Sequence, residues 1–170
     1  METLAEMVFI GEIVQQAKIA KLASERLRAT NDHFDELEVW SSIQSILAAA
    51  ANVSKILWPS RKLSTERGMR LRRLLNVDDD NLLADRKFRN HFEHYDERIE
   101  DWFIKHGSAV YRDSIVNSFG SIWGNNPPND HRAYNPVTQT LTFRGESVDL
   151  AALLNALEEI RHECLRFALP

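Results

Sequence analysis

The sequence has little cysteine, little lysine and no long apolar run. Because Cys164 is its single cysteine, an intrachain disulfide is excluded and a reducing compartment is favoured. The longest apolar run, residues 46–51, is far too short to span a bilayer. The N-terminus carries Glu2 and Glu6 where a secretory signal begins with basic residues. We therefore expect a cytoplasmic protein with no membrane partner.

Motifs for several common chemistries are also missing. We find no glycine-rich phosphate loop, no G-x-S-x-G nucleophile elbow and no cysteine–histidine nucleophile pair. Cys164 falls within a predicted final helix, where a small buried residue is its simplest role. These absences favour a chemistry that uses other polar side chains.

The composition is that of an ordinary soluble globule. The chain has 170 residues, of which 44% are hydrophobic and 27% charged, which argues against disorder, collagen-like structure and low complexity. This length predicts one domain, residues 1–170. A net charge of -4 argues against a surface that coats nucleic acid, whereas the excess of 15 Arg over 6 Lys favours local recognition of carboxylate or phosphate.

Helical spacing of apolar residues dominates the first two thirds of the chain. It predicts a first helix from about Leu4 to a break at residues 30–32, and a third helix from Ser64 to about Leu75. A fourth helix is predicted from residues 80–81 to about Lys105, and a final one over residues 150–165. The second helix ends before Pro59. Its predicted apolar stripe is Phe34, Leu37, Trp40, Ile43, Leu47, Ala50 and Leu57.

Residues 107–148 differ in composition from the helical segments. Gly, Pro, Asn and Ser gather between residues 118 and 129, which indicates a loop. Alternating residues 137–143, followed by residues 144–146, predict a small β-hairpin. The expected fold is thus mainly α, an antiparallel helical bundle of about five helices with a small β-hairpin before the C-terminal helix. Four residues of this insertion are expected either to line a ligand pocket or to lie in an exposed loop or pack the hairpin: Trp123, His131, Arg132 and Tyr134.

Residues 61–73 carry a local charge of +5, from six basic residues and Glu66. One interpretation is a solvated helix face that pairs with the acids at positions 78–80. The other is a patch that contacts RNA or phosphate, with Arg70 and Arg73 as its candidate residues. The composition leaves both open.

The segment from Arg86 to Ile99 is the most informative for chemistry. Its apolar residues step by four, three, four and three, which places them on one buried helix face: Phe88, Phe92, Tyr95, Ile99 and Trp102. The same geometry turns four polar residues away from that face: Arg89, Asn90, Glu93 and His94.

Three Arg-x-x-x-x-His patterns occur in the sequence. The first, Arg28 to His33, straddles the predicted helix break. The second, Arg86 to His91, places its histidine on the shoulder of the apolar stripe, where a structural histidine is the commoner outcome. The third places Arg89 and its histidine, His94, off the stripe, with Asn90 beside them.

This third pattern resembles the signature of the HEPN superfamily, helical-bundle proteins that include metal-independent ribonucleases, many of them toxins or antiviral effectors. The resemblance covers the helical portion of the chain and implies that Arg89 and His94 are the catalytic pair. It also gives Asn90 as the polar residue that follows the arginine, which either holds the RNA phosphate or orients His94. Arg86, in the turn leading to Arg89, is a further candidate for contact with RNA phosphate. A resemblance to this superfamily implies no metal and no cofactor.

One departure from the family concerns its tyrosine-bearing toxin branch. There a tyrosine stands two places after the histidine, whereas this chain has Asp96 at that place and Tyr95 one place earlier. Regulation through a modified tyrosine is therefore not carried over. A metal site that uses His91 and His94 with Glu93 or Glu97 is disfavoured, because the two imidazoles converge only at one flank of the helix.

A continuous helix would separate Arg89 and His94 by about 7.5 Å along its axis and about 140° in rotation. Two copies facing each other would bring both pairs into one cleft, so we expect a homodimer. The expected function is that of an endoribonuclease of toxin or defence type, with RNA as substrate and an antitoxin or regulatory protein as a further partner. The alternative is a catalytically silent HEPN-like module for binding or dimerisation.

Overall fold

The computed structural model describes residues 4–85, 90, 93–106, 111–117 and 130–167. This part of the chain is mainly helical, with five α-helices and a small four-stranded sheet before the last of them. Two short 3-10 helices join them. In chain order the elements are α1 (Leu4–Ala29), α2 (Glu36–Leu57), η1 (Lys62–Ser64), α3 (Thr65–Leu74), η2 (Leu82–Ala84), α5 (Tyr95–Lys105), β1 (Ile115–Val116), β2 (Arg132–Asn135), β3 (Thr140–Phe143), β4 (Glu146–Asp149) and α6 (Leu150–Cys164).

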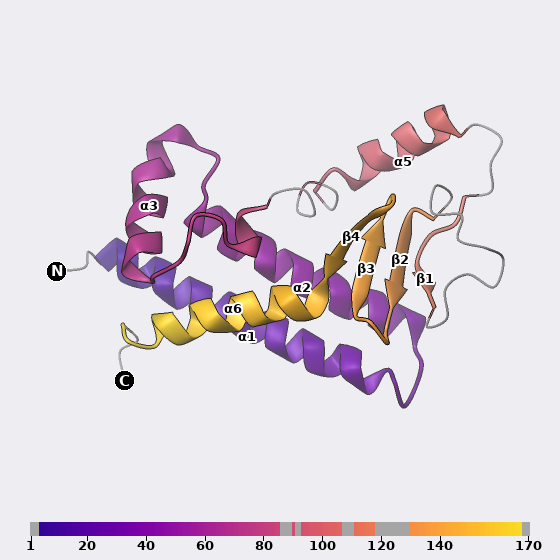
Figure 1. The fold of residues 1–170 in the computed structure, drawn as a ribbon, viewed down its shortest axis with the longest axis horizontal. Coiled ribbons are helices and arrows are strands. Elements are labelled where there is room, and N and C mark those ends of the chain that lie inside the picture. Colours follow the sequence, from indigo (N-terminus) through magenta and orange to yellow (C-terminus); the bar gives the residue numbers. More distant parts are fainter. Residues whose placement is uncertain (1–3, 86–89, 91–92, 107–110, 118–129, 168–170) are drawn as a thin grey trace.

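Helices α1, α2 and α6 pack side by side along the length of the molecule (Figure 1). The buried face of α1 is rich in alanine, at Ala17, Ala20 and Ala23, so neighbouring helices approach it closely. Cys164 of α6 is fully buried in the same core, and burial raises the pKa of its thiol to about 12. The prediction that this cysteine is a small core residue is confirmed. No helix of the described ranges has the length and apolarity needed to cross a membrane.

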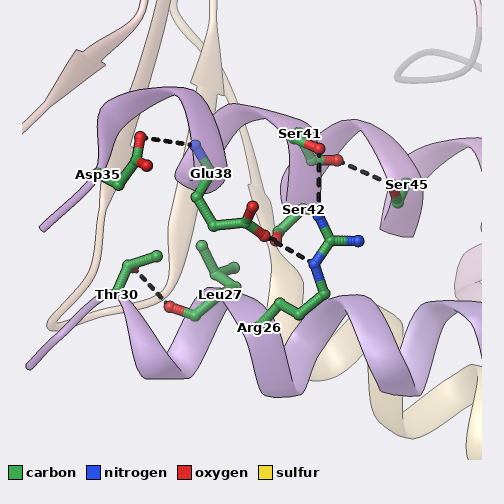
Figure 2. Close-up of polar contacts among 8 residues, drawn as sticks. All are labelled: Arg26, Leu27, Thr30, Asp35, Glu38, Ser41, Ser42 and Ser45. Atoms are coloured by element: carbon green, nitrogen blue, oxygen red, sulfur yellow. Dashed lines mark hydrogen bonds and ion pairs between the residues drawn. The ribbon is translucent and has the colours of Figure 1, made fainter. Parts of the chain in front are cut away.

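The turn between α1 and α2 is held by side chains that cross it (Figure 2). Arg26 of α1 donates to Glu38 of α2 at 2.7 Å, and Ser42 donates to the same carboxylate oxygen at 2.9 Å. Asp35 accepts from the backbone N–H of Glu38 and caps α2. These contacts set the relative position of the two long helices at this end.

The apolar stripe of α2 begins later than its spacing predicts. Phe34 and Leu37 are 66% and 79% exposed, because the helix starts only at Glu36 and its first turn extends beyond the covering elements. Trp40 is half-buried, and the stripe is buried from Ile43 onwards. The predicted end of the helix before Pro59 is confirmed, with Trp58 as the C-terminal cap.

The predicted hairpin is part of a mixed sheet with the strand order β1-β2-β3-β4. Strands β3 and β4 form the expected antiparallel pair, and Arg144 and Gly145 both adopt positive φ in the tight turn between them. Residues 137–139 are a turn rather than a strand, because the side chain of Asn135 accepts from the backbone N–H of Val137. Strand β1 adds a parallel edge to β2.

The predicted helix from residues 80–81 to Lys105 is not continuous. Leu82–Ala84 form a 3-10 helix and Asp85 is extended. Helix α5 begins only at Tyr95 and packs its aromatic face over the sheet, where Trp102 is buried. Of the predicted apolar stripe, Tyr95, Ile99 and Trp102 face inward as expected, whereas Phe88 and Phe92 lie outside the described residues.

Gly68 of α3 lies directly against the end of α2. A Cβ at this position would come within 2.6 Å of both the backbone oxygen of Leu57 and Cδ of Pro59. We expect Gly68→Ala to lower the free energy of unfolding by about 1–3 kcal/mol, measured by urea denaturation, because the backbone must shift. Gly11→Ala is the matched control, since nothing lies within 4 Å of its Cβ, and it should stabilise by about 0.5–1 kcal/mol. Equal stability of the two variants would contradict this packing.

Candidate functional site

His94 lies at a bend between a helical turn and α5. Its backbone N–H donates to the carbonyl of Asn90 at 3.0 Å, and its own carbonyl accepts from the N–H of Arg98 at 3.1 Å. Because its φ of -114° and ψ of 41° are not helical, the chain changes direction at this residue. A straight helix through His94 is therefore not what the structure shows.

Asn90 and His94 are one helical turn apart, and both are exposed. The structure thus brings two of the predicted site residues together. The predicted site residues Arg86 and Arg89 lie outside the described residues, as does His91 of the competing pattern.

The imidazole of His94 is oriented by a carboxylate. Its Nδ1 lies 3.3 Å from Oε1 of Glu97, one turn into α5, and 51% of the side chain is exposed. Its Nε2 has no hydrogen-bond partner among the described residues. A carboxylate on Nδ1 favours the tautomer that carries the proton there, which leaves Nε2 as the nitrogen that accepts a proton.

The surface around His94 is acidic. Residues 93–101 contain five acids and one arginine, and all five acids are exposed: Glu93, Asp96, Glu97, Glu100 and Asp101. Within the described ranges, no group of three or more His, Cys, Asp or Glu side chains is arranged to hold a metal ion. Two of these acids are ion-paired, Glu93 with Lys55 and Asp101 with Arg98 and Arg144.

The basic stretch of residues 61–73 divides into two groups. Arg70 forms ion pairs with Glu6 and Glu66, and Arg72 pairs with Asp79 at 2.7 Å, as the interpretation of a paired helix face predicts. Arg67 lies 4.4 Å above the ring of Phe9. The remaining basic residues of the stretch are exposed and lack partners among the described residues: Arg61, Lys62 and Arg73.

Figure 1 places α3 at the end of the molecule opposite to α5. Arg67 of α3 nevertheless donates to the backbone oxygen of Lys55, whose side chain pairs with Glu93, the residue before His94. The pairing of Arg70 with Glu6 serves to hold α3 against α1.

A polar cluster that the sequence pattern did not single out anchors the start of α5. Tyr95, the residue after His94, donates from its hydroxyl to Asp113 at 3.0 Å. Arg132 of β2 donates to both oxygens of Asp113, at 2.8 and 2.6 Å, and its guanidinium lies 5.2 Å from the ring of Trp40 and 4.6 Å from that of Tyr95. The position of His94 is thus tied to both α2 and the sheet.

The electrostatics of this cluster favour the ionised carboxylate. Burial by itself raises the pKa of Asp113, but the hydrogen bonds and charge of Arg132 outweigh it and hold this pKa below its ordinary value. Burial raises the pKa of Tyr95, so its phenol stays protonated and donates. Asp113 and Arg132 are 19 residues apart, a spacing that no helix or hairpin period connects.

Of the insertion residues with two open roles, three are described. His131 is fully buried and Tyr134 is 5% exposed, so both pack the interior, where His131 meets the rings of Tyr95 and Phe143. Arg132 belongs to the anchoring cluster, and Trp123 lies outside the described residues. For His131 and Tyr134 the packing role is therefore the one observed.

Any assignment of function to this chain depends on its own residues, because comparison with known proteins adds no evidence. No family model, no curated protein and no solved structure matches this chain.

Proposed function

We propose that this chain is a HEPN-like, metal-independent endoribonuclease that cuts RNA with His94 and Arg89. The observation that carries the proposal is the exposed His94–Glu97 pair, one helical turn from Asn90. Cleavage of RNA by its own 2′-hydroxyl needs a base for that hydroxyl, an acid for the leaving 5′-oxygen and a cation on the pentavalent phosphate. A histidine suits the first two tasks and an arginine the third.

In this proposal, His94 takes the proton of the 2′-hydroxyl at Nε2 while Glu97 stabilises the imidazolium that forms. The 2′-oxygen attacks the phosphorus, and the bond to the 5′-oxygen breaks. That oxygen receives a proton from a second imidazole, so the products carry 2′,3′-cyclic phosphate and 5′-hydroxyl ends. Asn90 and Arg86 hold the phosphate, and Arg89 neutralises its developing charge.

A homodimer supplies the second histidine. A two-fold axis near the bend at His94 would place both copies of the pair in one cleft, and two-fold dimers are the commonest oligomers. The fold on this proposal is an antiparallel helical bundle with an insertion at about 107–148, and the protein acts in the cytoplasm, under the control of an antitoxin or regulatory protein.

The acidic surroundings of His94 favour a second candidate function. Five exposed acids within residues 93–101 repel a polyanion and attract a basic protein surface. The alternative is therefore a catalytically silent HEPN-like module that docks or dimerises through this face.

One experiment separates the two candidates. The purified chain is incubated with total RNA, with and without EDTA, and the new ends are tested for 2′,3′-cyclic phosphate, while light scattering after size exclusion gives the mass. We expect cleavage that EDTA does not affect and the mass of a dimer. A monomer at micromolar concentration, or RNA that stays intact with a clean dimer, would overturn the nuclease, and the latter result would favour the docking module.

A further inference from the structure

A pocket of about 300 Å³ opens between α2, η2, β4 and α6. Its walls are mostly apolar, with Ala48 and Ala51 from α2, Leu82 from η2, Val148 from β4 and Leu153 from α6. A cavity of about 150 Å³ with aliphatic walls holds one benzene ring, so this pocket has room for about two fused rings. Its volume lies at the lower end of the roughly 300–1,000 Å³ typical of ligand sites.

The alanines of α2 create this space. Ala48 is exposed and Ala51 half-buried, one turn apart on the side of α2 that faces the pocket. Larger residues at these positions would fill it, and alanine and leucine differ little in helix propensity. The pocket therefore depends on small side chains that the stability of the helix does not require.

The charged residues of the lining already have partners within the protein. Lys55 forms an ion pair with Glu93, and Asp85 also has an interaction partner. The amide of Asn52, another lining residue, donates to Gln16 at 3.2 Å. Because these groups are engaged, they do not recruit a charged ligand, and an ion would also lose its hydration against the apolar walls. The pocket therefore favours a neutral molecule.

Ser54 of α2 offers such a molecule one specific polar contact. It lines the pocket, is only 3% exposed, and its hydroxyl oxygen has no hydrogen-bond partner among the described residues. Ser147, also in the lining, instead contacts the hydroxyl of Thr142 at 3.3 Å. A buried hydroxyl without a partner destabilises the folded protein, so a bound group that pairs with Ser54 removes this penalty.

We propose that this pocket binds a neutral, largely apolar molecule of two fused rings that carries one hydrogen-bonding group. The rings fill the space beside Ala48 and Ala51, and burial of their apolar surface provides most of the affinity. Rotation about the side-chain bond of Ser54 turns its hydroxyl towards the polar group, which selects among rings of equal size. The inference does not depend on the proposed cleavage of RNA.

Three bicyclic probes of similar size test the pocket. Indole carries one N–H, indene lacks it, and indole-5-carboxylate adds a negative charge. Each is titrated into the full chain, and amide chemical shifts report the site and the affinity. We expect shifts centred on the pocket residues and a Kd for indole on the order of 0.1–1 mM. Indene should bind about fivefold more weakly than indole. The carboxylate should bind about tenfold more weakly or less.

Two variants and a matched control show whether the pocket itself is responsible. Ala51→Leu should weaken indole binding about tenfold or more, and Ala5→Leu, on the exposed side of α1, should leave it unchanged. Ser54→Ala should bind indole no better than indene, because the N–H loses its partner. Circular dichroism should show the same helix content in all three.

The outcomes that contradict the proposal concern its separate parts. Indole that causes no shifts at the pocket residues, or that binds Ala51→Leu as well as Ala5→Leu, would overturn the binding site. Equal affinity of the wild-type protein for indole and indene, or a preference for indole that persists in Ser54→Ala, would overturn the role of Ser54. A carboxylate that binds as well as indole would overturn the preference for a neutral molecule.

Discussion

His94→Ala is expected to slow RNA cleavage by about a hundredfold or more, because it removes the group that moves the proton of the 2′-hydroxyl. Arg89→Ala should cost a similar factor, since it removes a positive charge from the phosphate in the transition state. Glu97→Gln should have a smaller effect, because the amide still contacts Nδ1 but no longer stabilises an imidazolium. Initial rates on a labelled oligonucleotide provide the measurement.

His33→Ala is the matched control for this series. His33 is exposed in the turn between α1 and α2 and ends another Arg-x-x-x-x-His pattern, yet it lies outside the proposed site. Its substitution should leave the rate unchanged, and circular dichroism should show the same helix content in all variants. A fully active His94→Ala variant, or an equal loss in His33→Ala, would refute the assignment of His94.

Arg132→Met is expected to produce the largest loss of stability, roughly 2–4 kcal/mol in urea denaturation. The Asp113 side chain is only 17% exposed, so removal of its partner leaves a carboxylate that is neither solvated nor paired. The loss should fall below that of a fully buried pair because Arg132 itself is 20% exposed. A release of α5 from the sheet should follow, since Tyr95 shares the same carboxylate.

A surface ion pair provides the comparison for this variant. Arg26 and Glu38 are 45% and 34% exposed, and Arg26→Met should cost about 1 kcal/mol or less. The double variant Arg132→Met with Asp113→Asn should recover part of the loss, because the unpaired charge is gone. If Arg26→Met and Arg132→Met lowered the free energy of unfolding equally, the buried cluster would contribute no more to stability than a surface ion pair.

The ion pair of Asp113 and Arg132 also makes the stability of the protein depend on pH. Because the folded protein holds the pKa of Asp113 below its ordinary value of 3.8, its contribution to stability is present above that value and is lost as the pH falls through the folded pKa. In Arg132→Met, protonation instead removes an unpaired charge. The stability difference between the wild-type protein and this variant should therefore narrow from pH 7 to pH 3. A difference that widens towards pH 3 would contradict the pairing of Asp113 with Arg132.

Local patterns predicted most of the helices because each depends on interactions within a few residues. The end of α2 before Pro59 follows from the missing proline N–H and from the clash of its ring with the preceding turn. The turn at Arg144–Gly145 is likewise local, since it needs a residue that tolerates positive φ. Such features need no knowledge of the distant chain.

The errors arose where distant residues compete with local preference. A helical pattern across residues 80–105 predicted one continuous helix. Instead, contacts from Lys55 to Glu93 and from Asp113 to Tyr95 attach the residues on either side of His94 to different parts of the fold. These contacts accompany the bend at His94. The apolar pattern at Phe34 and Leu37 likewise lacks a partner surface.

By itself, the sequence determined a mainly helical fold with a small β-hairpin before the last helix, and it singled out Asn90 and His94 as neighbours on a polar face. Only the tertiary structure decided that His94 lies at a bend, that Glu97 orients it, and that Arg70 forms ion pairs with Glu6 and Glu66. The physical reason is that periodicity reports which side of a helix is buried. Where helices end against one another depends on contacts between residues far apart in the chain, such as Asp113 with Arg132.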